Sequence, residues 1–318
     1  MLSRVADSIY WMSRYIERAE NVARFVDVNH HLMLDLPAGE PLQWIPLLIT
    51  AGGAEDFDAR YREEPSQGNV IHFLTFDSEN QNSILSSLRA ARENARSVRE
   101  IIPAILWEEL NEFYLYVEAE AVKQENRKFN YDFPRHVKRA GHLLEGVTNA
   151  TLSRGEAWHF SRIGRLLERA DKTTRIVDVK YFMLLPSHAD GGSPTDDLHW
   201  SAVLQSASAF AMYRRRHGMV QLGQTAAFLI LDPEFPRLVR NCVRRADESL
   251  HAITGTPLGA FQNSAERHMG QLVAELDYTD MEEVILQGLH EFLDGLQIKL
   301  NQVGDAIFDS FFALKPAV

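Results

Sequence analysis

The sequence predicts an all-α protein, a multi-helix bundle built from two tandem, sequence-related helical halves. Three observations lead to this prediction. Apolar residues recur every three or four positions along most of the chain, a fifteen-residue segment occurs twice, and no useful stretch alternates apolar and polar residues as a strand would. Apolar residues are 45% of the 318 residues, enough for a globular core. We expect the halves to be residues 1–150 and 151–318, packed as one compact unit.

Each half is expected to open with a long helix that carries an apolar stripe. Residues spaced by three and four positions share one face of an α-helix. In the first helix this stripe is Val5, Ile9, Met12, Ile16, Ala19, Ala23 and Val26. In the second half it returns as Phe160, Ile163, Leu167, Ala170, Thr174 and Val177.

Turn-forming residues divide the rest of the chain into shorter helices. Asp77 and Asp232, each followed two positions later by Glu, are interpreted as helix N-caps. Pro103 suits the first turn of another helix, and a last helix is expected over about residues 280–312. Clusters of proline and glycine predict breaks at 37–41, 65–68, 186–194 and 255–257.

The two copies of the repeated segment share most of their charged residues but differ at several apolar positions. RYIERAENVARFVDV at 14–28 and RLLERADKTTRIVDV at 165–179 agree at eight of fifteen positions, at an offset of 151. A weaker block, 73–77 against 228–232, repeats at an offset of 155. The retained charges suggest a polar constellation shared by the two halves. Its pairs are Arg14/Arg165, Glu17/Glu168, Arg18/Arg169, Arg24/Arg175 and Asp27/Asp178.

The charged face of the first helix is expected to be covered by protein. It also carries Tyr10, Phe25 and Val28, which a purely solvated face does not need. Buried carboxylates and guanidiniums must be paired, because an isolated buried charge costs several kcal/mol. Neighbours in sequence do not face each other on a helix. We therefore predict reciprocal pairing across the duplication, Glu17 with Arg169 and Glu168 with Arg18.

Two interpretations of this seam stay open. It can simply lock the two helices in register, with arginine chosen for its planar fork. Alternatively, the arginines bind an anion or a partner carboxylate in bidentate fashion, and Glu17 or Glu168 acts as a catalytic base or orients the ligand. The candidate anion- or partner-binding residues of the two helices are Arg14, Arg18, Arg24, Arg165, Arg169 and Arg175.

A second basic stripe is expected on a helix of the first half. Arg92, Arg96 and Arg99 continue from Arg89 at helical spacing, with Asn94 beside them. Arginines on one face repel each other unless acids or an anion meet them. The stripe is either a solvated face or an additional surface for an anion or a partner.

Metal and cofactor chemistry have little support in the sequence. Glu156 with His159 and Glu248 with His251 have the Glu-x-x-His spacing of di-iron bundles. These pairs do not map onto each other across the repeat, so a di-metal bundle is only a third reading and we expect no metal. No phosphate-binding glycine loop, nucleophile elbow or dinucleotide fingerprint occurs, and we expect no cofactor.

The charge balance limits the partners that we expect. The net charge is −11, so general attraction to nucleic acid or to an anionic membrane is not expected. No apolar run approaches the ~20 residues of a membrane helix, and charged residues interrupt the first fifteen positions. Cys242 is the single cysteine, which fits a reducing compartment. We expect a cytoplasmic protein.

Four motifs together give the chain a resemblance to a known family. They are MLSRVADSIYWM at 1–12, YIERAEN at 15–21, RENAR at 92–96 and HEFL at 290–293, and FLILDPEFP at 228–236 adds to them. With these motifs the chain resembles the alpha-E family, bacterial proteins predicted to be all-helical and named for a Glu-Arg motif. That motif falls on Glu17-Arg18 and, in the repeat, on Glu168-Arg169.

The resemblance implies which proteins act together with this one, but not a reaction that it catalyses. Alpha-E proteins typically occur beside, or fused to, circularly permuted ATP-grasp proteins, which form amide bonds, often with a transglutaminase-like protein nearby. The resemblance therefore implies an accessory helical protein that partners an ATP-grasp-type ligase in making or modifying a peptide-like product. The alternative is an enzyme in its own right, acting on an amide or acyl phosphate with glutamate as acid or base and arginine as anion clamp.

Overall fold

The computed structural model describes residues 1–37, 44–62, 64–124, 129–184 and 194–313. These residues form helices and no strand. In chain order they are α1 (Ser3–Asp35), α2 (Trp44–Ala51), α3 (Ala54–Arg60), α4 (Gln67–Thr75), α5 (Ile84–Ser97), α6 (Ala104–Gln124), α7 (Phe133–Thr151), α8 (Glu156–Leu184), α9 (Pro194–Ser206), α10 (Phe210–His217), α11 (Leu222–Leu231), α12 (Val239–Thr254), α13 (Ser264–Tyr278), α14 (Met281–Gln287), α15 (Leu289–Ile307) and the π-helix η2 (Phe308–Phe312). The predicted all-α class is confirmed.

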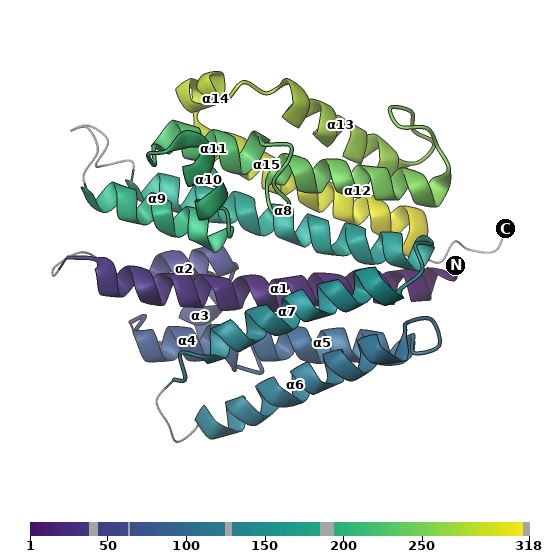
Figure 1. Ribbon diagram of the computed structural model, residues 1–318, viewed down its shortest axis with the longest axis horizontal. Coiled ribbons are helices and arrows are strands. Elements are labelled where there is room, and N and C mark those ends of the chain that lie inside the picture. The colour runs from purple at the N-terminus through teal and green to yellow at the C-terminus, as the bar shows by residue number, and fades with distance from the viewer. Residues whose placement is uncertain (38–43, 63, 125–128, 185–193, 314–318) are drawn as a thin grey trace.

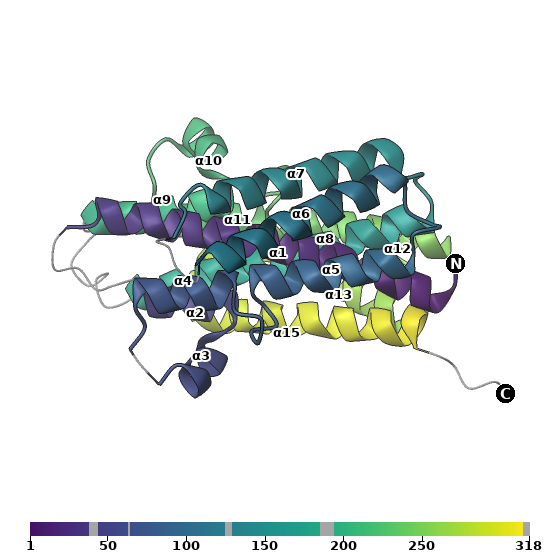
Figure 2. The same cartoon turned by 90° about the horizontal axis from the view of Figure 1, so that it is seen from below.

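The two long helices α1 and α8 lie side by side at the centre of the bundle (Figure 1). They run in parallel, because the Met1 amino group lies 2.5 Å from Glu156 and the Ser13 hydroxyl lies 2.8 Å from that of Ser161. Helices α5, α6 and α7 pack on the α1 side, and α12, α13 and α15 pack on the α8 side (Figures 1 and 2). Each central helix is therefore covered by helices that follow it in the chain and by the other long helix, and α9 and η2 also contact α1, as α2 contacts α8.

Both faces of α1 are covered, as the sequence predicts. Its apolar stripe is buried apart from Ile16, which is half-buried, and Tyr10, Phe25 and Val28 on the charged face are buried too. A side chain at Gly164 would place its Cβ 2.3 Å from the carbonyl oxygen of Tyr10. Glycine at this position thus permits the close approach of α8 to α1.

The predicted N-caps at Asp77 and Asp232 are wrong. Helix α5 begins after Ser83, whose hydroxyl accepts from the Ser86 amide, and α12 begins after Leu238. Both aspartates instead stabilise the turns that precede α5 and α12. Each Oδ1 accepts a hydrogen bond from the backbone amide two residues later, at 2.9 Å in both cases. An Asp-x-Glu sequence suits this turn as well as a helix start.

The predicted last helix is interrupted. Residues 280–312 form α14, α15 and η2, and Gly288 separates the first two with a φ of 129°. The break at 65–68 is confirmed by the capping box of Ser66, and the break at 255–257 by the left-handed Gly255. Most of the predicted breaks at 37–41 and 186–194 lies outside the described residues. Pro103 directly precedes α6, as expected.

The elements of the two parts of the chain follow a similar order. Each long helix is followed by short helices and then by the helix that packs beside it, α5 at Ile84 and α12 at Val239, which have the spacing of the second repeated block. The boundary predicted at 150/151 falls at the end of α7. None of the described helices is both long enough and apolar enough to cross a membrane.

Candidate functional site

A buried cluster of acids and arginines lies where α1 and α8 face each other. Helix α7 closes one side of it, and the turn before α12 closes another. We call this cluster the Glu/Arg seam. Its members are Glu17, Glu20, Glu145 and Glu168 with Arg14, Arg18, Arg24, Arg165, Arg169 and Arg237.

The carboxylate of Glu168 on α8 is held by two arginines of α1. Arg18 donates from Nε to Oε1 at 2.7 Å and from Nη2 to Oε2 at 3.1 Å. Arg14 donates from Nε to Oε2 at 2.9 Å, and its Nη1 donates to the Tyr10 hydroxyl. Only 1% of the Glu168 side chain is exposed. The predicted pairing of Glu168 with Arg18 is confirmed.

In the reciprocal pair, the acid lies on α1 and the arginine lies on α8. Arg169 on α8 donates from Nε and Nη2 to the two oxygens of Glu17 on α1, at 2.9 and 2.8 Å. The Nη2 of Arg169 also lies 3.1 Å from Oε2 of Glu145 on α7. Glu17 is 2% exposed. The predicted pairing of Glu17 with Arg169 is also confirmed. Glu17, Glu168 and Arg169 are buried, and Arg18 is half-buried.

Arg237, which no sequence pattern indicated, completes the second pair. Its Nη1 donates to Glu17 at 3.0 Å and to the Asn21 amide oxygen at 3.1 Å, and its Nη2 donates to Glu20. Arg237 lies in the turn before α12, outside the repeated segments. At the offset of 155, the position of Arg237 corresponds to that of Asn82, which accepts from Arg18 at 2.8 Å.

The remaining arginines of the repeat lie beside these pairs. Arg24 donates to Glu20 one turn away on the same helix. Arg165 contacts Glu145 at 3.2 Å, and Arg175 contacts Asp171 at 3.0 Å. The Nε atoms of Arg24 and Arg165 are buried without a partner among the described residues.

The electrostatics of the seam lower the pKa values of Glu168, Glu20 and Glu145. Burial raises the pKa of Glu168, but the guanidiniums of Arg18 and Arg14 outweigh it and hold that pKa well below its usual range. The pKa of Glu20 is also lowered, because Arg237, His142 and Arg24 together exceed the effect of burial. Burial and the neighbouring Arg237 lower the pKa of Arg24 to about 10.

This geometry suits ion pairs that hold α1 and α8 in register better than it suits a catalytic or anion-binding centre. A general base works best with a pKa near the working pH and within reach of its substrate. Glu17 and Glu168 are instead buried carboxylates whose oxygens already accept charge-assisted hydrogen bonds. The arginine forks that would clamp an anion are occupied by these same carboxylates.

The second basic stripe lies on the surface of α5 and of the turn after it. The prediction of a single helix is wrong for Arg99, because α5 ends at Ser97. Arg89, Arg96 and Arg99 are exposed, while Arg92 and Asn94 are half-buried. Among the described residues, no hydrogen bond or ion pair joins this stripe to the Glu/Arg seam.

Aromatic side chains of α6 cover part of the stripe. The guanidinium of Arg92 lies 5.1 Å from the ring centre of Tyr114, and that of Arg99 lies 4.9 Å from the ring centre of Trp107. Arg92 also donates to Asn111 of α6 at 2.7 Å, and Arg96 pairs with Glu93 at 2.9 Å. The stripe is thus anchored on the bundle and open to solvent.

The Glu-x-x-His spacings do not assemble a metal centre in the part of the chain that the structure describes. Glu156 binds the amino terminus, and Glu248 contacts Arg245. The Nε2 atom of His251 contacts Asp247. The described residues contain no group of three or more His, Cys, Asp or Glu side chains placed to hold a metal ion.

Relatives of the chain are found among mycobacterial proteins. The uncharacterized protein Mb2597 of Mycobacterium bovis and the uncharacterized protein Rv2567 of Mycobacterium tuberculosis are each 22% identical to it over 98% of this chain. The chain spans 37% of the length of these curated relatives. No solved structure matches the chain significantly.

A family model covers nearly the whole chain. It describes a predicted alpha-helical domain with a conserved ER motif, and it matches residues 1–312. In the structure, the Glu-Arg dipeptides of the repeated segment, Glu17-Arg18 and Glu168-Arg169, form the reciprocal pairs at the centre of the seam. The chain belongs to the Alpha-E family.

Proposed function

We propose that the chain is an accessory helical protein that partners an ATP-grasp-type amide ligase in the synthesis or modification of a peptide-like product. The observation that carries this proposal is the closed Glu/Arg seam. Both motif glutamates are committed to guanidiniums inside the bundle, so the motif holds a scaffold together. Under this proposal, the partner supplies the chemistry.

The lengths of the relatives support a role beside another polypeptide. In the two mycobacterial proteins, the region similar to this chain makes up 37% of the length. The helical unit is therefore part of a larger polypeptide in those proteins. The alpha-E resemblance implies that such a neighbour is an ATP-grasp protein, with a transglutaminase-like protein as a further associate.

The basic stripe on α5 is the surface that we assign to the partner. Arg96 and Arg99 are exposed, and Arg92 and Trp107 lie half-buried beside them. Arginine and tryptophan are enriched among the residues that dominate binding energy at protein interfaces. The ring contacts hold the guanidiniums against α6, which lowers the entropy that binding must remove.

Co-purification with the ATP-grasp protein of the same organism tests the proposal. We expect a complex on size-exclusion chromatography, with or without ATP and Mg²⁺. Reversing Arg96 and Arg99 to Glu is expected to weaken it roughly tenfold or more, because the charges would then repel the complementary surface. Arg267→Glu on α13 makes the same kind of change at another exposed arginine and is the matched control. Absence of a complex under every nucleotide condition would contradict the proposal.

The structure gives less support to an enzyme that uses Glu17 or Glu168 as its base. Such a reading requires these buried and fully paired carboxylates to move a proton. A Glu17→Gln, Glu168→Gln variant separates the two functions. Turnover lost from a folded, partner-binding variant would favour the enzyme, whereas loss of stability alone is expected for a scaffold.

A further inference from the structure

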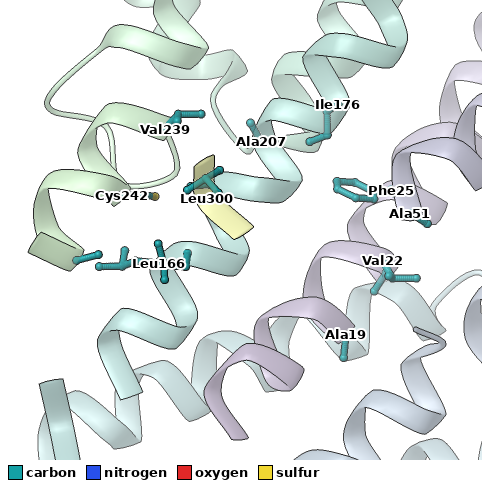
Figure 3. Close-up of a cluster of buried hydrophobic side chains, with 14 of the residues drawn as sticks. Ala19, Val22, Phe25, Ala51, Leu166, Ile176, Ala207, Val239, Cys242 and Leu300 are labelled. Carbon is teal, nitrogen blue, oxygen red and sulfur yellow. The ribbon is translucent and has the colours of Figure 1, made fainter. Parts of the chain in front are cut away.

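A groove lies between helices α6 and α7 at the edge of the bundle. The central helices are joined by buried apolar side chains, among them Phe25 of α1 and Ile176 of α8 (Figure 3). Between α6 and α7, by contrast, a cavity of about 370 Å³ remains. This volume lies within the range of about 300–1,000 Å³ that is usual for small-molecule sites. We call it the α6/α7 groove, and it is lined by Glu109, Glu112, Phe113, Tyr116, His136, Arg139, Ala140, Leu143 and Leu144.

The two walls of the groove carry opposite charges. Glu109 and Glu112 lie on the α6 wall, and Arg139 lies on the α7 wall. Glu112 and Arg139 are exposed, and Glu109 is half-buried. In the part of the chain that the structure describes, none of these three side chains forms an ion pair or a hydrogen bond. Their charges are therefore open to a ligand that is itself charged at both ends.

The floor between the charged walls is apolar and aromatic. Phe113 and Leu144 lie at its base and are 4% and 2% exposed. At one end, the ring of His136 stacks on the ring of Tyr116, with centres 3.8 Å apart and planes at 24°. An apolar floor with a few convergent polar groups is the usual composition of a small-ligand site.

The register of the two helices gives the spacing of the charges along the groove. Helices α6 and α7 run antiparallel (Figures 1 and 2). Because Tyr116 meets His136, Arg139 lies about level with Phe113. Glu109 lies four residues further along α6, or ~6 Å at about 1.5 Å per residue. Two residues of extended chain span about 7 Å, so a dipeptide reaches from the carboxylate to the guanidinium, whereas a single amino acid spans only about half that distance.

We propose that the α6/α7 groove binds a short zwitterionic peptide. Its terminal ammonium group donates to Glu109 and Glu112. Its terminal carboxylate accepts from the planar fork of Arg139, and an apolar side chain of the peptide packs on Phe113 and Leu144. The site deepens the proposed function, on which it rests for the choice of a peptide among zwitterions, because it names the class of substrate or product that the accessory protein would hold for the ligase.

Isothermal titration calorimetry of the full chain with L-alanyl-L-leucine tests the site. At about pH 7 both ends of this dipeptide are charged, because the pKa of an α-amino group is about 7.7–8.0 and that of an α-carboxyl group is about 3.3–3.7. We expect saturable binding. The N-acetyl dipeptide, the C-terminal dipeptide amide and free L-leucine are each expected to bind roughly tenfold more weakly or worse, because each loses one of the two charged contacts.

Two variants assign the walls. Arg139→Met removes the guanidinium and keeps an unbranched apolar side chain, and the double change Glu109→Gln with Glu112→Gln removes both negative charges. Each variant is expected to weaken dipeptide binding roughly tenfold or more. The Arg139→Met variant should also bind the dipeptide and its amide equally, since the contact that distinguishes them is gone. A merely weakened fold would not remove this preference.

Matched controls come from the same two helices. Arg135→Met on α7 and Glu108→Gln on α6 make the same kinds of change at exposed residues that do not line the groove. Both controls are expected to bind the dipeptide normally. Thermal unfolding of every variant without ligand verifies that a weaker affinity reflects the site.

Three results would overturn the proposal. They are the absence of saturable binding by the unmodified chain up to about 10 mM dipeptide, equal binding of the acetylated and amidated forms, and unchanged affinity in both groove variants. The titration contains no ligase, so it separates the two proposals. A ligase complex without peptide binding would refute this site alone, and peptide binding without a complex would refute the partnership alone.

Discussion

Replacing Glu168 by Gln removes a negative charge from between two guanidinium groups. The side chain keeps its size and one acceptor oxygen, so the change is electrostatic rather than steric. In the folded protein Arg14 and Arg18 would then face a neutral amide in a buried site. We expect the free energy of unfolding to fall, since each arginine has lost its counter-charge.

The magnitude follows from the surroundings of the two arginines. Removing one partner of a buried ion pair costs about 3–5 kcal/mol. The side chains of Arg14 and Arg18 are 15% and 16% exposed, so water offsets part of this cost. Each also keeps a neutral acceptor, the Tyr10 hydroxyl at 3.1 Å and the Asn82 amide oxygen at 2.8 Å. We therefore expect a loss near the lower end of the range, about 3 kcal/mol.

Urea denaturation followed by circular dichroism measures this loss, and its pH dependence tests the cause. The ordinary pKa of a glutamate carboxyl is 4.5, and the pKa of Glu168 in the folded protein is lower. Its charge therefore stabilises the fold fully above the ordinary value, and that stabilisation declines as the pH falls toward the folded-state pKa. The difference between wild type and variant should be largest near neutral pH and should shrink at about pH 3.

A double-mutant cycle with Arg18→Met isolates the pair. We expect a coupling free energy of roughly 1 kcal/mol or more between Glu168 and Arg18. A loss of stability below about 1 kcal/mol at neutral pH, or a loss that does not change with pH, would refute the idea that this carboxylate holds the two helices together.

Three further changes probe other parts of the same architecture. Gly164→Ala places a Cβ against the Tyr10 carbonyl oxygen and is expected to cost about 1–3 kcal/mol of unfolding free energy in urea melts, whereas Gly146→Ala, in open space on α7, should be neutral or stabilising. Arg237→Met leaves its glutamate partners with fewer cations and should cost about 2–4 kcal/mol by the same assay, and an unchanged melt would show that the third arginine is dispensable. Cys242 is fully buried and burial raises its pKa to about 12, so a thiol reagent should modify it only in denaturant, and rapid labelling of the native protein would contradict its position in the core.

The central ion pairs could be predicted because a charge that is buried requires a counter-charge. Glu17 and Arg169 recur as charges on helices whose opposite faces are both apolar enough to be covered. A covered charge needs a counter-charge. The adjacent arginine on the same helix points elsewhere, so the partner had to come from the other long helix.

The role of Arg237 and the starts of α5 and α12 could not be predicted from the sequence, for physical reasons. Arg237 lies in an irregular turn, where no periodicity indicates which way a side chain projects. Asp77 and Asp232 accept from amides two residues later, and the same short sequence would satisfy a helix N-terminus. Gly288 falls inside an otherwise helical pattern, and only the backbone shows that its φ is positive.

The crossed arrangement of the seam makes the two parts of the chain depend on each other. The acid of each Glu-Arg dipeptide is neutralised by a base that lies about half the sequence away. A fragment that ended after α7 would keep Arg18 and Glu17 but would have lost Glu168 and Arg169. Severing the α7–α8 connection should therefore produce two pieces that fold properly only when they reassociate, which makes this bundle suited to fragment complementation.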